Sequence, residues 1–251
     1  MIARIRAAGS TDVIQMGESY AEANQYLLDE VLPKDPNGVY VSAYDHPDIW
    51  TGCASLVHEI KTQMGENGPP DAVVLCVGGG GLFCGVMQGL EECYGKGKMP
   101  RVVAVETIGA AGLHKSLQKG ELVTLDAITT QAMSLGAKRV AEQAFKYGQR
   151  ENVKSLVIED AEAAMGVWRL ADDEKLLVEM ACGASVAFAY DGRLKRVVED
   201  LGPKSKVVII VCGGAGISVE MIMKWREQFA SAEKLATNDQ DVSSTHTAPE
   251  G

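Results

Sequence analysis

The four consecutive glycines at Gly78–Gly81 are the residues whose type and spacing point most directly to chemistry. A short β-branched apolar run, residues 72–77, precedes them, and apolar residues at helical spacing follow over residues 82–90. Glycines between a strand and a helix let the backbone approach an anion closely, and the first N–H groups of the helix point at it. We interpret this turn as an anion site, against the alternative of a tight turn that binds nothing. No Gly-Lys-Ser/Thr follows and the spacing is not G-x-G-x-x-G, so the usual nucleotide motifs do not explain it.

A second unit of the same kind lies near the end of the chain. The apolar run at residues 207–211 leads into Cys212, Gly213, Gly214, Ala215 and Gly216. Ligands of open α/β sheets bind at the carboxyl ends of the strands, so two such turns can face one crevice. Periodicity does not fix the strand order, but the pattern favours one ligand shared by both turns.

Strands that alternate with helices must position these turns, and this alternation predicts an α/β fold with a mostly parallel, twisted sheet and helices on both faces. Ser19 is a possible N-cap of the first helix and Pro33 a possible end. The polar residues 232–251 show no periodicity and are expected to form a disordered tail. The expected strands cover residues 38–42, 72–77, 101–105, 156–158 and 207–211. The expected helices cover residues 20–32, 48–63, a segment after the glycines, a segment near Leu113, residues 134–147, a segment opened by Asp160, and residues 183–198 and 217–229.

Composition and charge exclude several classes of protein. A net charge of -10 over 251 residues argues against a nucleic-acid binder, which normally carries a basic patch. No apolar run reaches membrane-spanning length, so no membrane partner is expected. The 6 cysteines include no C-x-x-C pair and form no ligand-like cluster with the 4 histidines. Reduced, buried thiols are therefore expected rather than a zinc site.

Several segments together resemble the serine/threonine dehydratases of the fold-type II (tryptophan synthase β-like) pyridoxal-phosphate enzymes, closest to the L-serine ammonia-lyase branch. The similarity extends in order from about residue 5 to residue 230. Each motif alone is moderately specific, whereas the set identifies the family. The segments are Trp50–Ile60 (WTGCASLVHEI), Val77–Leu82 with CGVMQGL following, Val103–Ala110 (VAVETIGA), Asp172–Ala187 (DDEKLLVEMACGASVA) and Val207–Ser218 (VVIIVCGGAGIS).

The resemblance implies a cofactor, pyridoxal 5'-phosphate, and a reaction. Cys212 would lie beside the pyridine nitrogen, where a thiol is a weak hydrogen-bond partner and the ring is a tempered electron sink. That environment suits β-elimination, which would convert L-serine to pyruvate and ammonia. Whether L-threonine is also a substrate stays open. The residues that would hold the phosphate through their backbone are Gly78, Gly79, Gly80, Gly81 and Leu82.

The family resemblance also implies a monovalent cation, K+, near the phosphate turn. The matching positions are Glu106, Ala110, Leu135 and Ala137, and they would act largely through backbone carbonyls. Gly112 stands where a serine ligand is expected, which is a departure from the family pattern. Glu179 and Cys182 match a family stretch, E-x-A-C-G-A, that lines the active-site side of the large domain. Asp172 and Asp173 are expected to cap a helix.

Two family motifs are not found. The reaction needs a Schiff-base lysine, which the family carries in an S-x-x-K segment near the amino terminus, followed by an S-x-G-N-A-G loop. No such segment occurs near the amino terminus here, and the fifteen lysines match non-catalytic positions. The expected domains are a remnant of the small domain at residues 1–45 and the large pyridoxal-phosphate-binding domain at residues 46–231. We expect an inactive fragment that leaves apolar surface uncovered.

Two other readings stay open beside this one. The chain can be a catalytically dead family member that binds a phosphate compound or regulates a full-length paralogue. An unrelated dinucleotide binder, with Glu106 as the ribose-binding acid, fits the glycine spacing poorly. The resemblance implies an amino acid as the substrate, a homodimer in the intact family and a place in amino acid metabolism and gluconeogenesis. No targeting signal is legible, so the cytoplasm is the default location.

Overall fold

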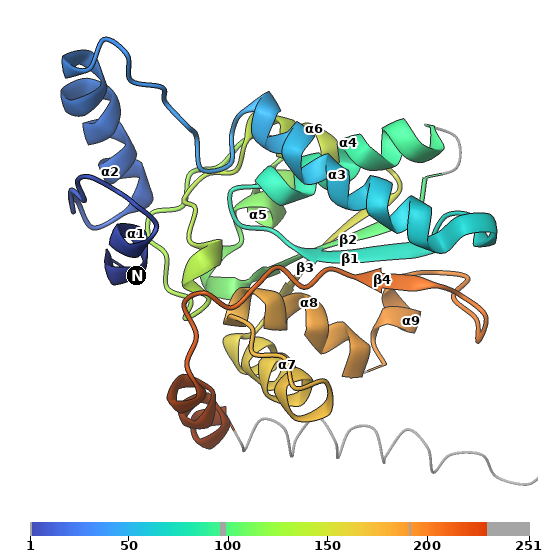
Figure 1. Cartoon of the computed structure of the whole chain (residues 1–251). Coiled ribbons are helices and arrows are strands. Elements are labelled where there is room, and N and C mark those ends of the chain that lie inside the picture. Colours follow the sequence, from blue (N-terminus) through green and yellow to red (C-terminus); the bar gives the residue numbers. More distant parts are fainter. Residues whose placement is uncertain (1, 96–98, 191, 230–251) are drawn as a thin grey trace, which may run out of the picture.

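The centre of the protein is a parallel sheet of four strands in the order β3-β2-β1-β4 (Figure 1). The computed structural model describes residues 2–95, 99–190 and 192–229. Within that range the carboxyl ends of all the strands lie at one edge of the sheet, as the alternation of elements predicts. The strands are β1 (Ala72–Cys76), β2 (Arg101–Thr107), β3 (Val153–Ile158) and β4 (Val207–Ile209).

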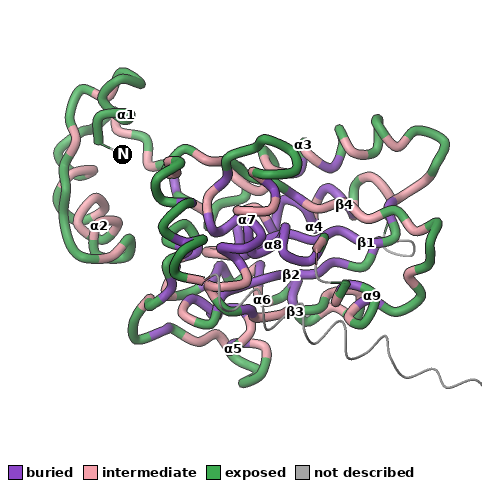
Figure 2. The backbone as a smooth tube through the Cα atoms, turned by 90° about the horizontal axis from the view of Figure 1, so that it is seen from below, coloured by how far each residue is buried: buried purple, intermediate pink, exposed green. Residues whose placement is uncertain are grey.

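Helices cover both faces of the sheet, and the alternation of side chains along β1 shows which residues face which layer (Figure 1). Val73 and Leu75 pack towards one layer, whereas Val74 and Cys76 pack towards the other. Figure 2 shows the buried residues concentrated along these strands. The first layer consists of α3 (Pro47–Met64), α4 (Gly81–Tyr94), α5 (Gly112–Lys119) and α6 (Glu142–Gly148); the second consists of α7 (Asp160–Asp173), α8 (Met180–Tyr190), α9 (Leu194–Val197) and the helix over residues 219–229.

Burial of β1 on both faces explains its composition. All its residues, Ala72–Cys76, are buried, and the strand is hydrogen-bonded on both sides. Each large apolar side chain buried in this way contributes about 1.5–3 kcal/mol. A strand of this kind reads as a continuous apolar run rather than as an alternating one, which is why the sequence locates it well.

The amino-terminal segment lies to one side of these layers (Figure 1). It contains α1 (Ile2–Ala7) and α2 (Tyr20–Tyr26). The side chain of Ser19 accepts a hydrogen bond from the N–H of Glu22, which confirms the expected N-cap. The helix does not continue as one α-helix to residue 32: it changes to a π turn at Leu27–Val31 and a 3-10 turn at Leu32–Lys34. Pro33 in the last turn cannot donate the hydrogen bond of a longer helix.

Three other expected elements differ in the structure. Residues 38–42 are extended but form no strand, because no neighbouring strand pairs with them within the described residues. The expected helix at 134–147 is instead the 3-10 turn Met133–Leu135, an irregular segment and α6. The expected helix at 183–198 is divided into α8 and α9, with Gly192 at φ 68° between them.

The remaining boundaries agree within a few residues, except that β4 ends at Ile209 rather than at residue 211. Asp160 opens α7 as expected, behind a capping box made by Glu159 and Glu162. The expected tail at residues 232–251 lies outside the described residues, and the division at residue 45 stays a prediction. Among the described helices, none has the length and apolar character required to span a membrane.

The close crossing of α3 and α4 gives a test of the packing. A Cβ added to Gly85 would lie 2.3 Å from the Cβ of Cys53 and 2.6 Å from the carbonyl oxygen of Trp50. We expect Gly85→Ala to lower the free energy of unfolding by about 1–3 kcal/mol, because the helices must separate. Gly52→Ala is the matched control: nothing lies within 4 Å of its added Cβ, so higher helix propensity should leave stability unchanged or raised. Urea unfolding of both variants measures the free energy of unfolding. If Gly85→Ala were as stable as Gly52→Ala, the close packing of α3 and α4 would be contradicted.

Candidate functional site

The first glycine turn leaves a run of backbone donors without partners. The last strand bond before it runs from the N–H of Val77 to the carbonyl of Val105, and the first helix bond after it runs from Cys84 to Gly80, both at 2.8 Å. Between them, the N–H groups of residues 78–83 have no acceptor among the described residues. Gly80 has φ 95°, a conformation that glycine adopts without strain. Free donors at the start of a helix form a site for an anion.

Close neighbours on several sides explain why these positions are glycines. A Cβ on Gly79 would lie 2.3 Å from the ring of Tyr44, and one on Gly80 would lie 2.5 Å from the Cβ of Ala144. A Cβ on Gly78 would lie 3.0 Å from the Cα of Leu135. The turn is therefore enclosed by the loop before α3, by α6 and by the segment between β2 and α6.

The second glycine turn lies next to the first, because β4 is the direct neighbour of β1. The Sγ atoms of Cys76 and Cys212 are 3.9 Å apart. The sequence could not establish this proximity, and the strand order now does. Gly214 has no space for a side chain, since an added Cβ would lie 2.2 Å from the carbonyl oxygen of Leu177.

Glu179 and Cys182, at the start of α8, hold the second turn in place. The carboxylate of Glu179 accepts a hydrogen bond from the N–H of Gly216 at 2.7 Å and another from the hydroxyl of Ser134. Its own N–H donates to the carbonyl of Gly213 at 3.0 Å. The Sγ of Cys182 accepts from the N–H of Cys212 at 3.2 Å and from that of Gly213 at 3.3 Å. These two side chains therefore position the turn rather than simply line it.

Glu106 is a fully buried carboxyl near the end of β2, beside the first turn. Its two oxygens accept hydrogen bonds from the N–H groups of Leu113 at 2.8 Å and His114 at 2.7 Å, in the first turn of α5. Burial raises the pKa of Glu106 to about 8, although these hydrogen bonds lower it. A buried carboxyl that needs this much support is a place where a cation would stabilise the charged form.

The other expected cation ligands lie buried around the same part of the fold. Ala110, Leu135 and Ala137 are all buried. The carbonyl oxygen of Ala137 lies 3.9 Å from the position that a Cβ on Gly112 would take, and Gly112 is the first residue of α5. The structure thus brings Ala137 close to the helix start that Glu106 binds. Their role as cation ligands stays a prediction.

Tyr44, Ala144 and Ser134 contact the site, and the sequence reasoning missed all three. Tyr44 donates from its hydroxyl to the carbonyl of Arg139 at 3.0 Å, and its ring lies 5.5 Å from that of Tyr20. No motif marks these residues, because they reach the glycines from loops and a helix that periodicity does not place. The only available signal was the run of glycines itself, which implies close neighbours.

Several lysines of the described chain have partners away from the glycine turns. Lys61 donates to the carbonyl of Cys93 at 3.0 Å and Lys206 to that of Asn67 at 2.8 Å. Lys119 and Lys146 form ion pairs with glutamates at 2.7 and 2.6 Å. None of these contacts is at either glycine turn.

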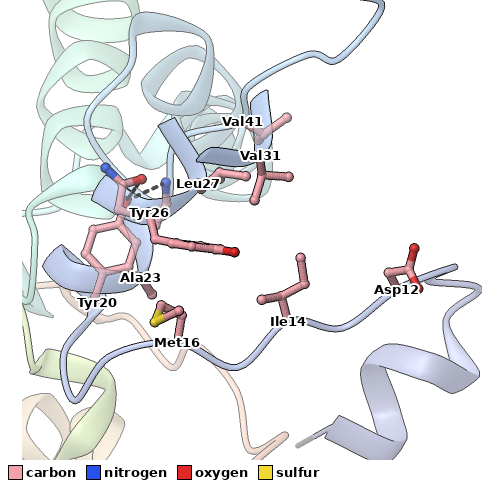
Figure 3. Close-up of a pocket in the computed structure, with 11 residues that line it drawn as sticks. Asp12, Ile14, Met16, Tyr20, Ala23, Tyr26, Leu27, Val31 and Val41 are labelled. Atoms are coloured by element: carbon pink, nitrogen blue, oxygen red, sulfur yellow. Dashed lines mark hydrogen bonds between the residues drawn. The ribbon is translucent and has the colours of Figure 1, made fainter. Parts of the chain in front are cut away.

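A separate apolar cavity lies between α2 and residues 12–16 (Figure 3). Its volume is about 430 Å³, and Ile14, Met16, Tyr20 and Tyr26 are among its lining residues. Nearby, Val39 is 85% exposed and Val41 is 70% exposed. Apolar side chains are therefore exposed in this segment.

Comparison with known proteins agrees with this geometry. Residues 1–213 match the family described as pyridoxal-phosphate dependent enzymes. The chain belongs to this family. Its glycine turn, with free N–H donors at a helix start, is thereby placed in a group of proteins that bind a phosphate-bearing cofactor.

Individual relatives within the family are similar along most of the chain. The L-serine dehydratase/L-threonine deaminase of Homo sapiens is 40% identical over 237 residues, which cover 93% of this chain and 70% of the relative. The serine dehydratase-like protein of Rattus norvegicus is 44% identical over 231 residues, covering 91% of this chain and 68% of the relative. The crystal structure of a fungal L-serine ammonia-lyase from Rhizomucor miehei superposes with a TM-score of 0.82 at 35% identity. The superposition covers 91% of this chain and 70% of the fungal chain.

Glu106 gives a prediction for the dependence of stability on pH. Its native pKa of about 8 lies above the ordinary value of 4.5, so the native state keeps a proton that the unfolded state loses. The stability that Glu106 contributes is complete below about pH 4.5 and is lost as pH rises to about 8, by at most about 1.4 kcal/mol per pH unit.

We expect Glu106→Gln to remove this slope, since glutamine does not titrate. Urea unfolding from pH 5 to pH 9 compares the variant with the unaltered chain. Parallel curves for the two proteins would show that Glu106 ionises normally.

Proposed function

We propose that the site binds pyridoxal 5'-phosphate for the β-elimination of the hydroxyl group of L-serine, which leads to pyruvate and ammonia after hydrolysis, with L-threonine as a second substrate. The run of unpartnered N–H groups at residues 78–83 carries this proposal, because a phosphate dianion satisfies such donors. The family match supplies the cofactor class, and the relatives named as L-serine dehydratase or ammonia-lyase supply the reaction.

The residues present fit this cofactor. The phosphate would be held by the backbone N–H groups of Gly78, Gly79, Gly80, Gly81 and Leu82. Because the four glycines have no side chains, the phosphate can approach these N–H groups closely. When bound, the cofactor supplies an electron sink for a carbanion at the substrate Cα. The chain itself supplies the anion site, the walls that exclude water and the thiol beside it.

Cys212 would present a neutral partner to the pyridine nitrogen. The hydrogen bond with Cys182 lowers the pKa of the Cys212 thiol, but contact with Cys76 and burial outweigh it and raise the pKa to about 12. The proton therefore stays on the sulfur at neutral pH. A neutral thiol stabilises a protonated pyridine ring less than a carboxylate does. The ring would therefore withdraw electrons from the substrate less strongly, which suits β-elimination.

We further propose that the 251-residue chain alone binds the cofactor without turning over substrate. The reaction requires a lysine on the cofactor aldehyde, and the lysines whose contacts are described above are engaged away from both turns. The full activity would then need the S-x-x-K and S-x-G-N-A-G segments to be supplied together with this site.

The proposal extends to a K+ ion held near Glu106 by the carbonyls of Ala110, Leu135 and Ala137. The buried carboxyl supports it, because a nearby cation would offset the cost of ionising it. A homodimer and a contribution to gluconeogenesis complete the proposal and rest on the family resemblance alone, whereas a cytoplasmic location is the default assignment.

A titration with pyridoxal 5'-phosphate tests the site. We expect the chain to bind the cofactor saturably, as measured by absorbance, and Gly79→Ala to bind it at least about tenfold more weakly, a difference of about 1.4 kcal/mol. The added Cβ would overlap the ring of Tyr44, so the backbone of the turn must shift. Gly52→Ala should bind normally. Pyridoxal without its phosphate should bind poorly to all three proteins.

Borohydride reduction of the same samples tests the missing lysine. We expect no saturable, phosphate-dependent adduct on any lysine when the peptides are analysed by mass spectrometry. A stoichiometric adduct would support the cofactor but contradict the proposed loss of turnover. Equal binding of the cofactor to Gly79→Ala and the unaltered chain would contradict the phosphate site.

A comparison of salts tests the cation. We expect K+ to raise the unfolding temperature above that in choline chloride of equal ionic strength, with the larger effect at pH 9 than at pH 6, since the cation stabilises the ionised carboxylate. Glu106→Gln should respond equally to both salts. An identical K+ effect in the variant would place the cation elsewhere.

A further inference from the structure

Three cysteines from separate parts of the sequence meet where β1 and β4 end. Cys76 is the last residue of β1, Cys182 lies in the first turn of α8, and Cys212 directly precedes the second glycine turn. The Sγ atoms of Cys76 and Cys212 are 3.9 Å apart. No group of three or more Cys, His, Asp or Glu in the described part of the chain is arranged to hold a metal ion. Their proximity therefore calls for another chemistry.

The ends of β1 and β4 bring the sulfurs of Cys76 and Cys212 close enough for a disulfide to form between them. Val74 pairs with Ile209, and the N–H of Ile210 donates to the carbonyl of Val74 at 2.9 Å. Neighbouring strands lie about 4.8 Å apart, and a disulfide needs its Cα atoms about 4.4–6.8 Å apart. Cys212, just beyond the paired residues, follows the end of β4 beside the end of β1. Continued by two residues, this register places Val211 opposite Cys76, so the contact between the two sulfurs depends on the chain leaving β4 after Ile209.

Cys182 is a poorer partner for Cys212 in such a bond. Its sulfur accepts the N–H groups of Cys212 and Gly213, and therefore supports the backbone of the turn. A bond to Cys182 would break both hydrogen bonds. A bond to Cys76 leaves them in place.

We propose that Cys76 and Cys212 are a modification site, which forms a reversible disulfide that prevents cofactor binding at the adjacent turns. The disulfide itself depends only on the geometry of the two thiols. Its effect on the cofactor rests on the proposed function, because it removes the thiol placed beside the pyridine nitrogen and ties the second glycine turn to β1.

The reaction is an exchange with a low-molecular-weight disulfide. The sulfur of Cys212 loses its proton and attacks one sulfur of the oxidant, whose second sulfur leaves and takes up a proton. The sulfur of Cys76 then loses its proton and attacks the sulfur of Cys212, which releases the second half of the oxidant as a thiol. Two protein thiols are oxidised and one small disulfide is reduced to two thiols.

Access and protonation determine how this exchange proceeds. Cys212 is exposed, whereas Cys76 is only 7% exposed, so an oxidant in solvent meets Cys212 first. The raised pKa of the Cys212 thiol, about 12, leaves little thiolate at neutral pH. The exchange is therefore slow at pH 7 and faster at pH 9, a property of a site that responds to sustained rather than brief oxidation.

Disulfide mapping tests the modification without any cofactor. The chain is incubated with oxidised glutathione at pH 9, free thiols are alkylated, and the peptides are analysed by mass spectrometry without reduction. We expect a linked pair of peptides containing Cys76 and Cys212, lost after dithiothreitol treatment. Cys76→Ala should instead keep glutathione attached to Cys212. The control Cys93→Ala, altered at a cysteine of α4 beside His58, should form the linkage normally.

Each outcome decides the proposal. A linkage between Cys182 and Cys212, or Cys212 left free or only glutathionylated in the unaltered chain, would overturn it. A linkage between Cys76 and Cys212 supports it.

Titration with pyridoxal 5'-phosphate then separates the disulfide from the proposed function. We expect the oxidised chain to bind at least tenfold more weakly than the reduced chain, and dithiothreitol to restore its binding. Equal binding by both forms of the unaltered chain would overturn the effect on the cofactor while leaving the disulfide established. No binding by the reduced chain would instead count against the proposed function.

Discussion

β1 is hydrogen-bonded on both sides, to β2 and to β4, and this double pairing determines where every part of the candidate site lies. It places the first glycine turn between the end of β2, which carries Glu106, and the end of β4, which leads into Cys212. Residues separated by more than a hundred positions thus reach one edge of the sheet. A one-residue slip of the β1 register would turn each side chain toward the other helix layer, whose packing it does not match, so the arrangement has little freedom.

The walls of the site come from irregular segments, and each is fixed by polar contacts rather than by regular secondary structure. Asp160 accepts hydrogen bonds from Thr130 at 2.5 Å and from the N–H of Gln131 at 2.6 Å, and Glu179 accepts one from Ser134. The N–H of Ala141 donates to the carbonyl of Gly79 at 2.9 Å. These contacts carry the segment between β2 and α6 past the first glycine turn. Hydrogen bonds to charged groups contribute about 1.5–3 kcal/mol each and neutral ones about 0.5–1.5 kcal/mol, so several are needed to order a segment of this length.

The sequence predicted the parts of the fold that depend on local pattern. Buried parallel strands such as β1 are continuous apolar runs, and the two glycine turns at strand ends are unmistakable. The expected helix at 134–147 failed because Ser134 and Leu135 lie against Gly78, and this tertiary contact outweighs helical spacing. The expected strand at 38–42 failed because β-structure requires a partner, which one segment cannot reveal. Tyr44 could not be placed for the same reason: its contact with Gly79 depends on two loops whose paths are not encoded locally.

The ring of Tyr44 rests against Gly79, and Tyr44 in turn contacts an aromatic side chain six residues further along the chain. The indole N–H of Trp50 donates to the carbonyl of Tyr44 at 2.8 Å. The other two tryptophans, Trp168 and Trp225, belong to the opposite layer, where the guanidinium of Arg226 lies 3.9 Å from the centre of the Trp168 ring. Any displacement of Tyr44 by an incoming anion therefore changes the polarity around one indole only. We therefore expect the fluorescence of Trp50 to change when an anion binds at the first glycine turn, so that binding can be followed without an added label.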